Sequence, residues 1–147
     1  MNIGVDLGWT VKGVRANGNK DTIAPDSFRV IKRLVNRGDT VFVISKVNSA
    51  QKERAEKWLK DVNFFEETGI KPENVYFCFE KKDKAVFVKA LDIKIMIDDR
   101  TEVMANLPVL VVKFLISPDV FEYHKFSHML YNCKMVANWL EIEKSLF

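Results

Sequence analysis

The sequence has little cysteine and histidine, and no apolar stretch in it is long. Two cysteines and two histidines among 147 residues exclude a disulfide-rich scaffold, and the two cysteines are too far apart in sequence to form a metal-ligand motif. His124 and His128 stand four residues apart without an evident third ligand, so we expect surface or packing positions for them. Cys78 and Cys133 lie in apolar surroundings, which favours buried free thiols in a reducing compartment.

The sequence also lacks a charge excess of one sign and a membrane-spanning segment. Its 23 basic and 20 acidic side chains are interspersed and give a net charge of +3, so no strong nucleic-acid signature is present. No apolar stretch approaches the roughly 20 residues that cross a bilayer. Asp6 falls where a secretory leader would need its apolar core. We therefore expect a cytoplasmic protein without membrane contact, built as one domain over residues 1–147. Its oligomeric state stays open.

Short apolar runs alternate with segments of helical periodicity along the chain. The expected strands are residues 1–5, 40–44, 75–79, 93–97 and 109–115. The expected helices begin at Pro25, around Glu102 and at Ser117, and three others are expected to be capped by Ser49, Asp83 and Asn132. Continuous apolar strands between helices indicate a parallel sheet buried on both faces. The predicted fold class is therefore α/β, a three-layer Rossmann-like parallel sheet with helices on both faces.

Three segments have more local predictions. The alternation over residues 11–15 indicates a small hairpin closed at Asn17-Gly18, and residues 64–70 are expected to form a loop. The inward residues of the helix after Asp83 are expected to be Val86, Phe87 and Ala90. The residues expected to pack from the last helix are Met135, Val136, Trp139, Leu140 and Ile142.

Polar side chains follow three of the predicted strands directly. Asp6 follows the first strand, Ser45 the second, and Asp98-Asp99 the fourth. Ligands of open parallel sheets bind beyond the carboxyl ends of the strands, so these groups should gather at one edge. Carboxylates, a hydroxyl and a nearby lysine suit a magnesium ion with a phosphate.

Lys84 is the lysine that we expect at this edge, because it lies at the start of a predicted helix. Lys81, Lys82 and Lys89 are alternatives for the same role, since all lie on or beside that helix. Asp6, Ser45 and the acidic pair also have a simpler interpretation as polar ends of strands.

The order of these motifs resembles the haloacid dehalogenase-like superfamily, whose members are mostly magnesium-dependent phosphohydrolases. The family pattern has Asp-X-Asp-X-Thr after the first strand, Ser or Thr after the second, a lysine on a helix, and a later acidic pair. The matching segments are Asp6-Leu7-Gly8-Trp9-Thr10, Val43-Ile44-Ser45, Lys84 and Ile97-Asp98-Asp99-Arg100, and the match covers roughly residues 2–115.

The resemblance implies an aspartyl-phosphate mechanism with Mg²⁺ as the cofactor. Asp6 would attack phosphorus, Ser45 would bind the non-bridging phosphoryl oxygens, and Lys84 would neutralise their charge. The implied metal ligands are Asp6, the backbone carbonyl of Gly8, Asp98 and Asp99.

The sequence departs from the family pattern at Gly8, where the family has its second aspartate. In phosphatase members that aspartate protonates the leaving group and activates water, and glycine cannot transfer a proton. General acid–base catalysis contributes typically about 10²–10⁴-fold. We therefore expect weakened hydrolysis or, as an alternative, a catalytically silent module that recognises phosphorylated partners. Trp9 replaces the usual glycine and is expected to crowd or line the site.

The short first loop gives two further expectations. Only residues 11–24 separate the first motif from the first helix, which leaves no room for the large cap domain of bigger family members. The resulting open site suits an extended or macromolecular phosphorylated substrate. Residues 3–10 also resemble the first phosphate loop of actin and sugar-kinase ATPases, where Asp-X-Gly-X-Thr opens a hairpin. An ATP-binding fragment is thus a second alternative.

Overall fold

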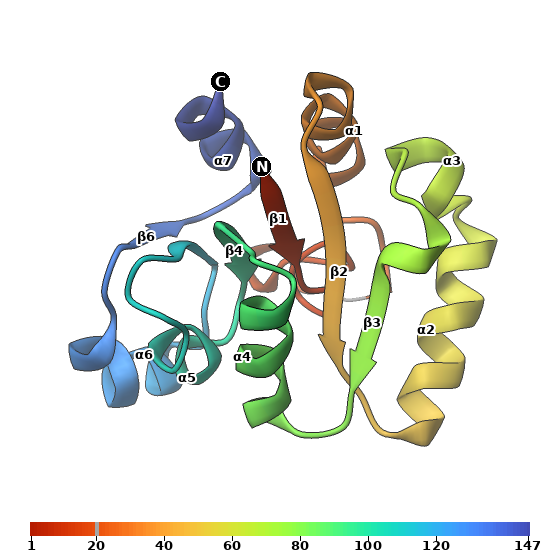
Figure 1. Cartoon of the computed structure of the whole chain (residues 1–147). Helices are drawn as coiled ribbons and strands as arrows, with labels where there is room; N and C mark the ends of the chain where they lie inside the picture. The colour runs from red at the N-terminus through yellow and green to blue at the C-terminus, as the bar shows by residue number, and fades with distance from the viewer. Residues whose placement is uncertain (20) are drawn as a thin grey trace.

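A six-stranded parallel sheet forms the centre of the computed structural model, which describes residues 1–19 and 21–147 (Figure 1). Its strand order is β3-β2-β1-β4-β5-β6, and all five pairings are parallel. The strands are β1 (Asn2–Val5), β2 (Thr40–Lys46), β3 (Val75–Cys78), β4 (Ile95–Asp98), β5 (Val112–Ile116) and β6 (Cys133–Val136). The prediction of a parallel α/β sheet is confirmed.

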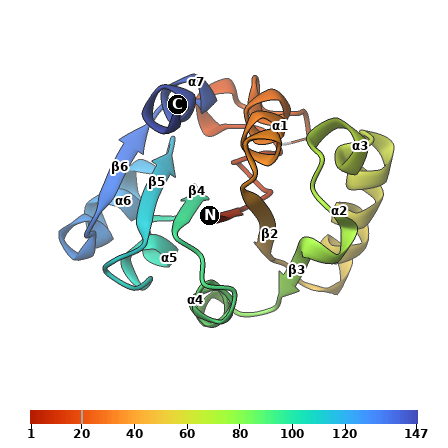
Figure 2. The same cartoon turned by 45° about the horizontal axis from the view of Figure 1, so that its top comes forward.

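Helices cover both faces of this sheet (Figure 2). The helices are α1 (Ser27–Arg37), α2 (Ser49–Asp61), α3 (Phe64–Thr68), α4 (Lys81–Ala90), α5 (Thr101–Ala105), α6 (Val120–Phe126) and α7 (Trp139–Leu146), with 3-10 turns η1 (Arg15–Asn17), η2 (Pro72–Asn74) and η3 (Ser127–Met129). One apolar cluster joins the sheet to α1, α2, α3 and α7, and a second joins it to α4 and α5. Since neighbouring strand residues point to opposite faces, both faces are apolar and the strand sequences are continuous apolar runs.

The C-terminal segment differs from its prediction. Asn132 does not cap a helix, because Cys133–Val136 forms β6 at the sheet edge and pairs with β5. The last helix begins only at Trp139, after Asn138, whose side chain accepts a hydrogen bond from the backbone N–H of Glu141. Apolar spacing over so few residues does not separate a strand from a helix, and pairing with β5 decides it. In this segment Val136, Trp139 and Ile142 are buried, whereas Met135 and Leu140 are exposed.

The start of α4 also differs from the prediction. The helix begins at Lys81 after Glu80, so Asp83 lies in its first turn and is not the cap. The buried face of α4 consists of Lys84 and Val88, whereas Val86 is exposed. Of the predicted inward residues, Phe87 packs against the apolar cluster, whereas Val86 and Ala90 are exposed, because the buried lysine lies on the inward side of the helix.

Three smaller predictions are corrected as well. The cap of α2 is Asn48, which forms a capping box with Gln51, and not Ser49. Residues 64–70, expected as a loop, contain the helix α3. No hairpin ladder forms in the described part of residues 7–24, which has only single bridges of Lys12 with Gly8 and Ile23, and the turn η1. This segment inserts no cap domain, and it does not open the hairpin that the ATPase resemblance implied.

The cysteines lie in or near the core, and the histidines lie on the surface. Cys78 is buried and Cys133 is half-buried, and both are free thiols. His124 and His128 are exposed on α6 and η3. Among the described residues, every helix is too short or too polar to cross a membrane.

Candidate active site

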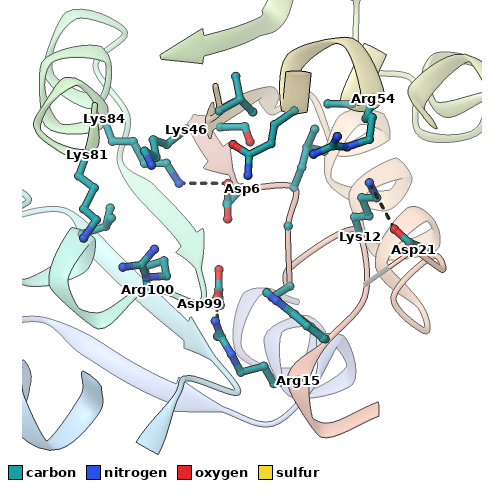
Figure 3. A pocket seen from close by; sticks show the side chains of 18 residues that line it. Asp6, Lys12, Arg15, Asp21, Lys46, Arg54, Lys81, Lys84, Asp99 and Arg100 are labelled. Atoms are coloured by element: carbon teal, nitrogen blue, oxygen red, sulfur yellow. Dashed lines mark hydrogen bonds and ion pairs between the residues drawn. The ribbon is translucent and has the colours of Figure 1, made fainter. Parts of the chain in front are cut away.

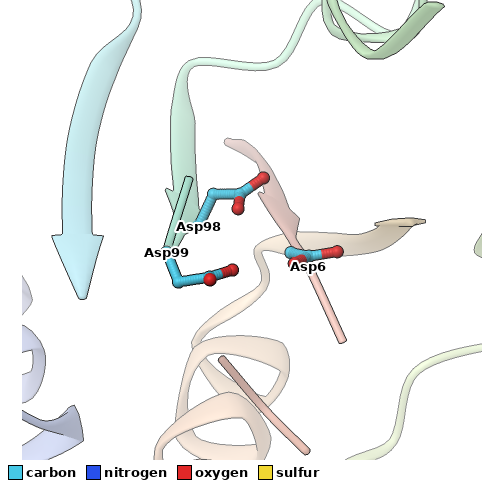
Figure 4. A group of neighbouring side chains, drawn as sticks. All are labelled: Asp6, Asp98 and Asp99. Carbon is cyan, nitrogen blue, oxygen red and sulfur yellow. The ribbon is translucent and has the colours of Figure 1, made fainter. Parts of the chain in front are cut away.

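Asp6, Asp98 and Asp99 come together at the carboxyl end of the central strands. β1 and β4 are neighbours, and the backbone N–H of Asp6 donates to the carbonyl of Ile97 at 3.0 Å. The strand order reverses direction between β1 and β4, and ligands of open α/β sheets bind at such a point. All three carboxylates are buried, and their facing oxygens lie within 4.8 Å of one another (Figure 4).

Burial and the neighbouring carboxylates disfavour the ionised forms of Asp6 and Asp99. Burial, and next the charge of Asp98, raises the pKa of Asp6 to about 6. Burial, and next the charges of Asp98 and Asp6, raises the pKa of Asp99 to about 9. A divalent cation among these oxygens would offset the repulsion, and a cluster of carboxylates is the ligand type that Mg²⁺ prefers. The residues present therefore fit a magnesium ion.

Lys84 lies on the first turn of α4 and points into this cluster. Its Nζ is 3.0 Å from Oδ1 of Asp6 and 2.7 Å from Oδ2 of Asp98. Burial alone would lower the pKa of this ammonium, but the two carboxylates outweigh burial and raise the pKa. Lys84 is therefore a buried, charged group beside Asp6. The other three candidate lysines are Lys81, which pairs with Glu102, Lys82, which pairs with Glu80, and the exposed Lys89.

Asp99 is held by Thr10 of the first motif and by Arg15, which the sequence did not identify as functional. Arg15 forms an ion pair with one carboxylate oxygen, and the hydroxyl of Thr10 lies 3.4 Å from the other. The carbonyl of Thr10 in turn accepts a hydrogen bond of 2.9 Å from the indole N–H of Trp139, which is fully buried. The last helix therefore fixes the loop after Asp6, so Trp139 supports the site in addition to packing in the core.

Replacing Trp139 by Phe should destabilise the fold more than the same change at Trp58. Trp139→Phe keeps an aromatic ring but leaves the buried Thr10 carbonyl without its donor, at a cost of about 1–3 kcal/mol in the free energy of unfolding. Trp58 donates to the carbonyl of the exposed Asp21, where water can replace the indole. Urea unfolding of both variants measures the difference, and equal losses would contradict this role for Trp139.

Ser45, Gly8 and Trp9 line the cavity in front of the acids. Ser45 was expected to follow β2 directly, but it is the penultimate residue of that strand. Its side chain is buried. A Cβ placed on Gly8 would meet no atom within 4 Å. Trp9 adopts a φ of 55° and is half-buried, and its ring lies 5.6 Å from the guanidinium carbon of Arg15. Trp9 therefore lines the cavity wall.

The cavity has a volume of about 410 Å³ and is open to solvent. Figure 3 shows basic side chains around Asp6 and Asp99 on its wall. These side chains are Lys12, Arg15, Lys46, Arg54, Lys81, Lys84 and Arg100. They come from the first loop, β2, α2, α4 and the end of β4, so the sequence scatters them and the fold gathers them.

No family model matches the sequence, and neither does any curated protein. Solved structures do resemble it. D,D-heptose 1.7-bisphosphate phosphatase from B. bronchiseptica, complexed with magnesium and phosphate, superposes with a TM-score of 0.67 at 11% identity, covering 99% of this chain and 97% of that one.

Two further structures have the same arrangement. A protein described as a haloacid dehalogenase-like hydrolase, from Burkholderia xenovorans LB400, matches with a TM-score of 0.61 at 11% identity over 84% of this chain and 58% of that one. A protein described as a 3-deoxy-D-manno-octulosonate 8-phosphate phosphatase, from Vibrio cholerae, matches with a TM-score of 0.51 at 14% identity over 92% and 73%. The chain therefore has the haloacid dehalogenase-like fold that its motif order predicted.

Proposed function

We propose that this chain is a magnesium-dependent phosphohydrolase that works through an aspartyl phosphate on Asp6. The supporting observation is that Asp6, Asp98, Asp99 and Lys84 converge at one end of a cavity whose wall is rich in cations. The solved phosphatase that binds magnesium and phosphate shares this fold. An open cavity and a basic wall suit an extended phosphorylated substrate.

In this mechanism the phosphoryl group is transferred in two successive displacements, first to Asp6 and then to water. A carboxylate oxygen of Asp6 attacks phosphorus, and the bond from phosphorus to the leaving oxygen breaks. Water then attacks the acyl phosphate and regenerates Asp6 with release of inorganic phosphate. Lys84 holds Asp6 in place, and together with Ser45 it would bind the phosphoryl oxygens. Mg²⁺ held by Asp6, the Gly8 carbonyl, Asp98 and Asp99 would supply positive charge at the phosphoryl group.

Gly8 favours a second candidate function. The position that would transfer a proton to the leaving group has no side chain, although the cavity has room for one. A domain with the remaining groups could bind a phosphorylated partner through Mg²⁺ and Lys84 without hydrolysing it. This candidate predicts phosphate binding in the absence of turnover.

Turnover of an activated aryl phosphate with Mg²⁺ tests the proposal. We expect wild-type protein to release the aryl alcohol slowly and Asp6→Asn to release none above background, because the amide cannot form the acyl phosphate. Asp21→Asn is the control, since Asp21 lines the same cavity but is exposed and faces Lys12. Turnover that survives in Asp6→Asn would contradict the mechanism, and its absence in wild type would favour the silent module.

A further inference from the structure

The cations of the cavity wall differ in what they contact. Near the acids, Lys84 and Arg15 face Asp6, Asp98 and Asp99. Farther out, Lys81 pairs with Glu102 and Arg100 with Glu122. These basic side chains already have acidic partners within the protein, so they add little attraction for a ligand beyond the phosphate bound at Asp6.

Lys46 and Arg54 have no such partners. Lys46 is the last residue of β2, directly after Ser45, and Arg54 lies on α2. Both line the cavity, both are exposed, and neither side chain makes an ion pair or hydrogen bond with another described residue. Lys12 is 3.8 Å from Asp21, whose side chain is 78% exposed. Uncompensated positive charge is therefore concentrated on the β2–α2 part of the wall (Figure 3).

This charge exceeds what one phosphate at Asp6 requires. A magnesium ion with Lys84 and Arg15 exceeds the charge of the three aspartates by one, and a phosphate dianion at Asp6 turns this into a net charge of minus one. Lys46 and Arg54 offset that negative charge and leave one positive charge beyond it, which suits a second phosphate group, either a monoester or a diester. A guanidinium binds two phosphate oxygens at once, and a lysine adds a point charge.

We propose that the β2–α2 wall binds a second phosphate, so that the preferred ligands carry two phosphate groups. One phosphate lies at Asp6 and the other at Lys46 and Arg54. This inference rests on the proposed function for the position of the first phosphate. It defines the substrate class as compounds with two separated phosphates, and the source of the second phosphate is either a small bisphosphate or a nucleotide strand.

Calorimetric titration with matched ligand pairs tests this inference. Fructose 1,6-bisphosphate is compared with fructose 6-phosphate, and a 5′-phosphorylated dinucleotide with a nucleoside 5′-monophosphate, all with Mg²⁺ at constant ionic strength. We expect the doubly phosphorylated member of at least one pair to bind about tenfold tighter, a difference of about 1.4 kcal/mol. The pair that shows the gain identifies the source of the second phosphate. Equal affinities in both pairs would overturn the inference.

Variants assign the gain to the β2–α2 wall. In Arg54→Gln and Lys46→Gln the advantage of the second phosphate should shrink severalfold, while affinity for the monophosphate stays the same. Lys57→Gln is the control, because Lys57 is on α2, outside the cavity, and pairs with Asp61. Equal weakening of both ligands in the Arg54 and Lys46 variants would overturn the inference. Monophosphate binding that does not need Mg²⁺ would instead count against the proposed function. The comparison within each ligand pair would still show whether a second phosphate increases the affinity.

Discussion

Gly8→Asp is expected to raise magnesium-dependent turnover of an aryl phosphate by about 10²–10⁴-fold, the usual contribution of a general acid–base group. The aspartate would protonate the leaving oxygen and then take a proton from the attacking water. The structure accommodates the change, because no atom lies within 4 Å of a Cβ at this position. Gly8 is also absent from the residues with positive φ, so a side chain adds no backbone strain.

Gly8→Asn is the matched control for this gain, since it has nearly the same shape but transfers no proton at neutral pH. The gain should be larger for phenyl phosphate than for p-nitrophenyl phosphate, because a poor leaving group depends more on protonation. Initial rates of both variants with both substrates measure this. Equal rates for Gly8→Asp and Gly8→Asn would show that the missing proton donor does not limit the activity.

Magnesium is expected to stabilise the folded wild-type protein but not Asp99→Asn. Binding at 100 times the dissociation constant adds about 2.7 kcal/mol, which corresponds to a rise of roughly 5–10 °C in Tm for a domain of this size. The physical reason is the burial of three carboxylates whose facing oxygens lie within 4.8 Å. Without the ion, Asp99→Asn should be at least as stable as wild type, because burial and the charges of Asp98 and Asp6 oppose ionisation of Asp99, and the half-exposed Arg15 can still reach water.

Thermal unfolding with EDTA or with millimolar Mg²⁺ measures both effects. Asp21→Asn again serves as the control, because it removes an aspartate of the same cavity that lies outside the acidic cluster. It should retain the full magnesium shift. An equal shift in Asp99→Asn, or no shift in wild type, would rule out the cluster as the metal site.

The alternation of apolar runs with helical periodicity was sufficient to predict the parallel sheet. Five of the six strands and the polar residues at their ends were recognised, because burial on both faces leaves a continuous apolar run that is a local property of the chain. β6 was missed because it is a four-residue edge strand in which Lys134 interrupts the apolar run. The hairpin over residues 11–18 was wrong for a related reason, since alternation over five residues does not specify a partner strand.

The order of Asp6, Ser45, Lys84 and Asp98-Asp99 along the chain was sufficient to predict these candidate site residues. The fold brings them to one edge of the sheet, because the carboxyl ends of parallel strands lie on the same side. Which lysine enters the cluster depends on how α4 rotates against the sheet. The support of Asp99 by the Thr10 loop depends on Trp139, a residue 129 positions from Thr10. The cations of the cavity wall come from five separate segments. Local periodicity has no information on contacts between such distant segments, and packing of the helices against the sheet establishes them.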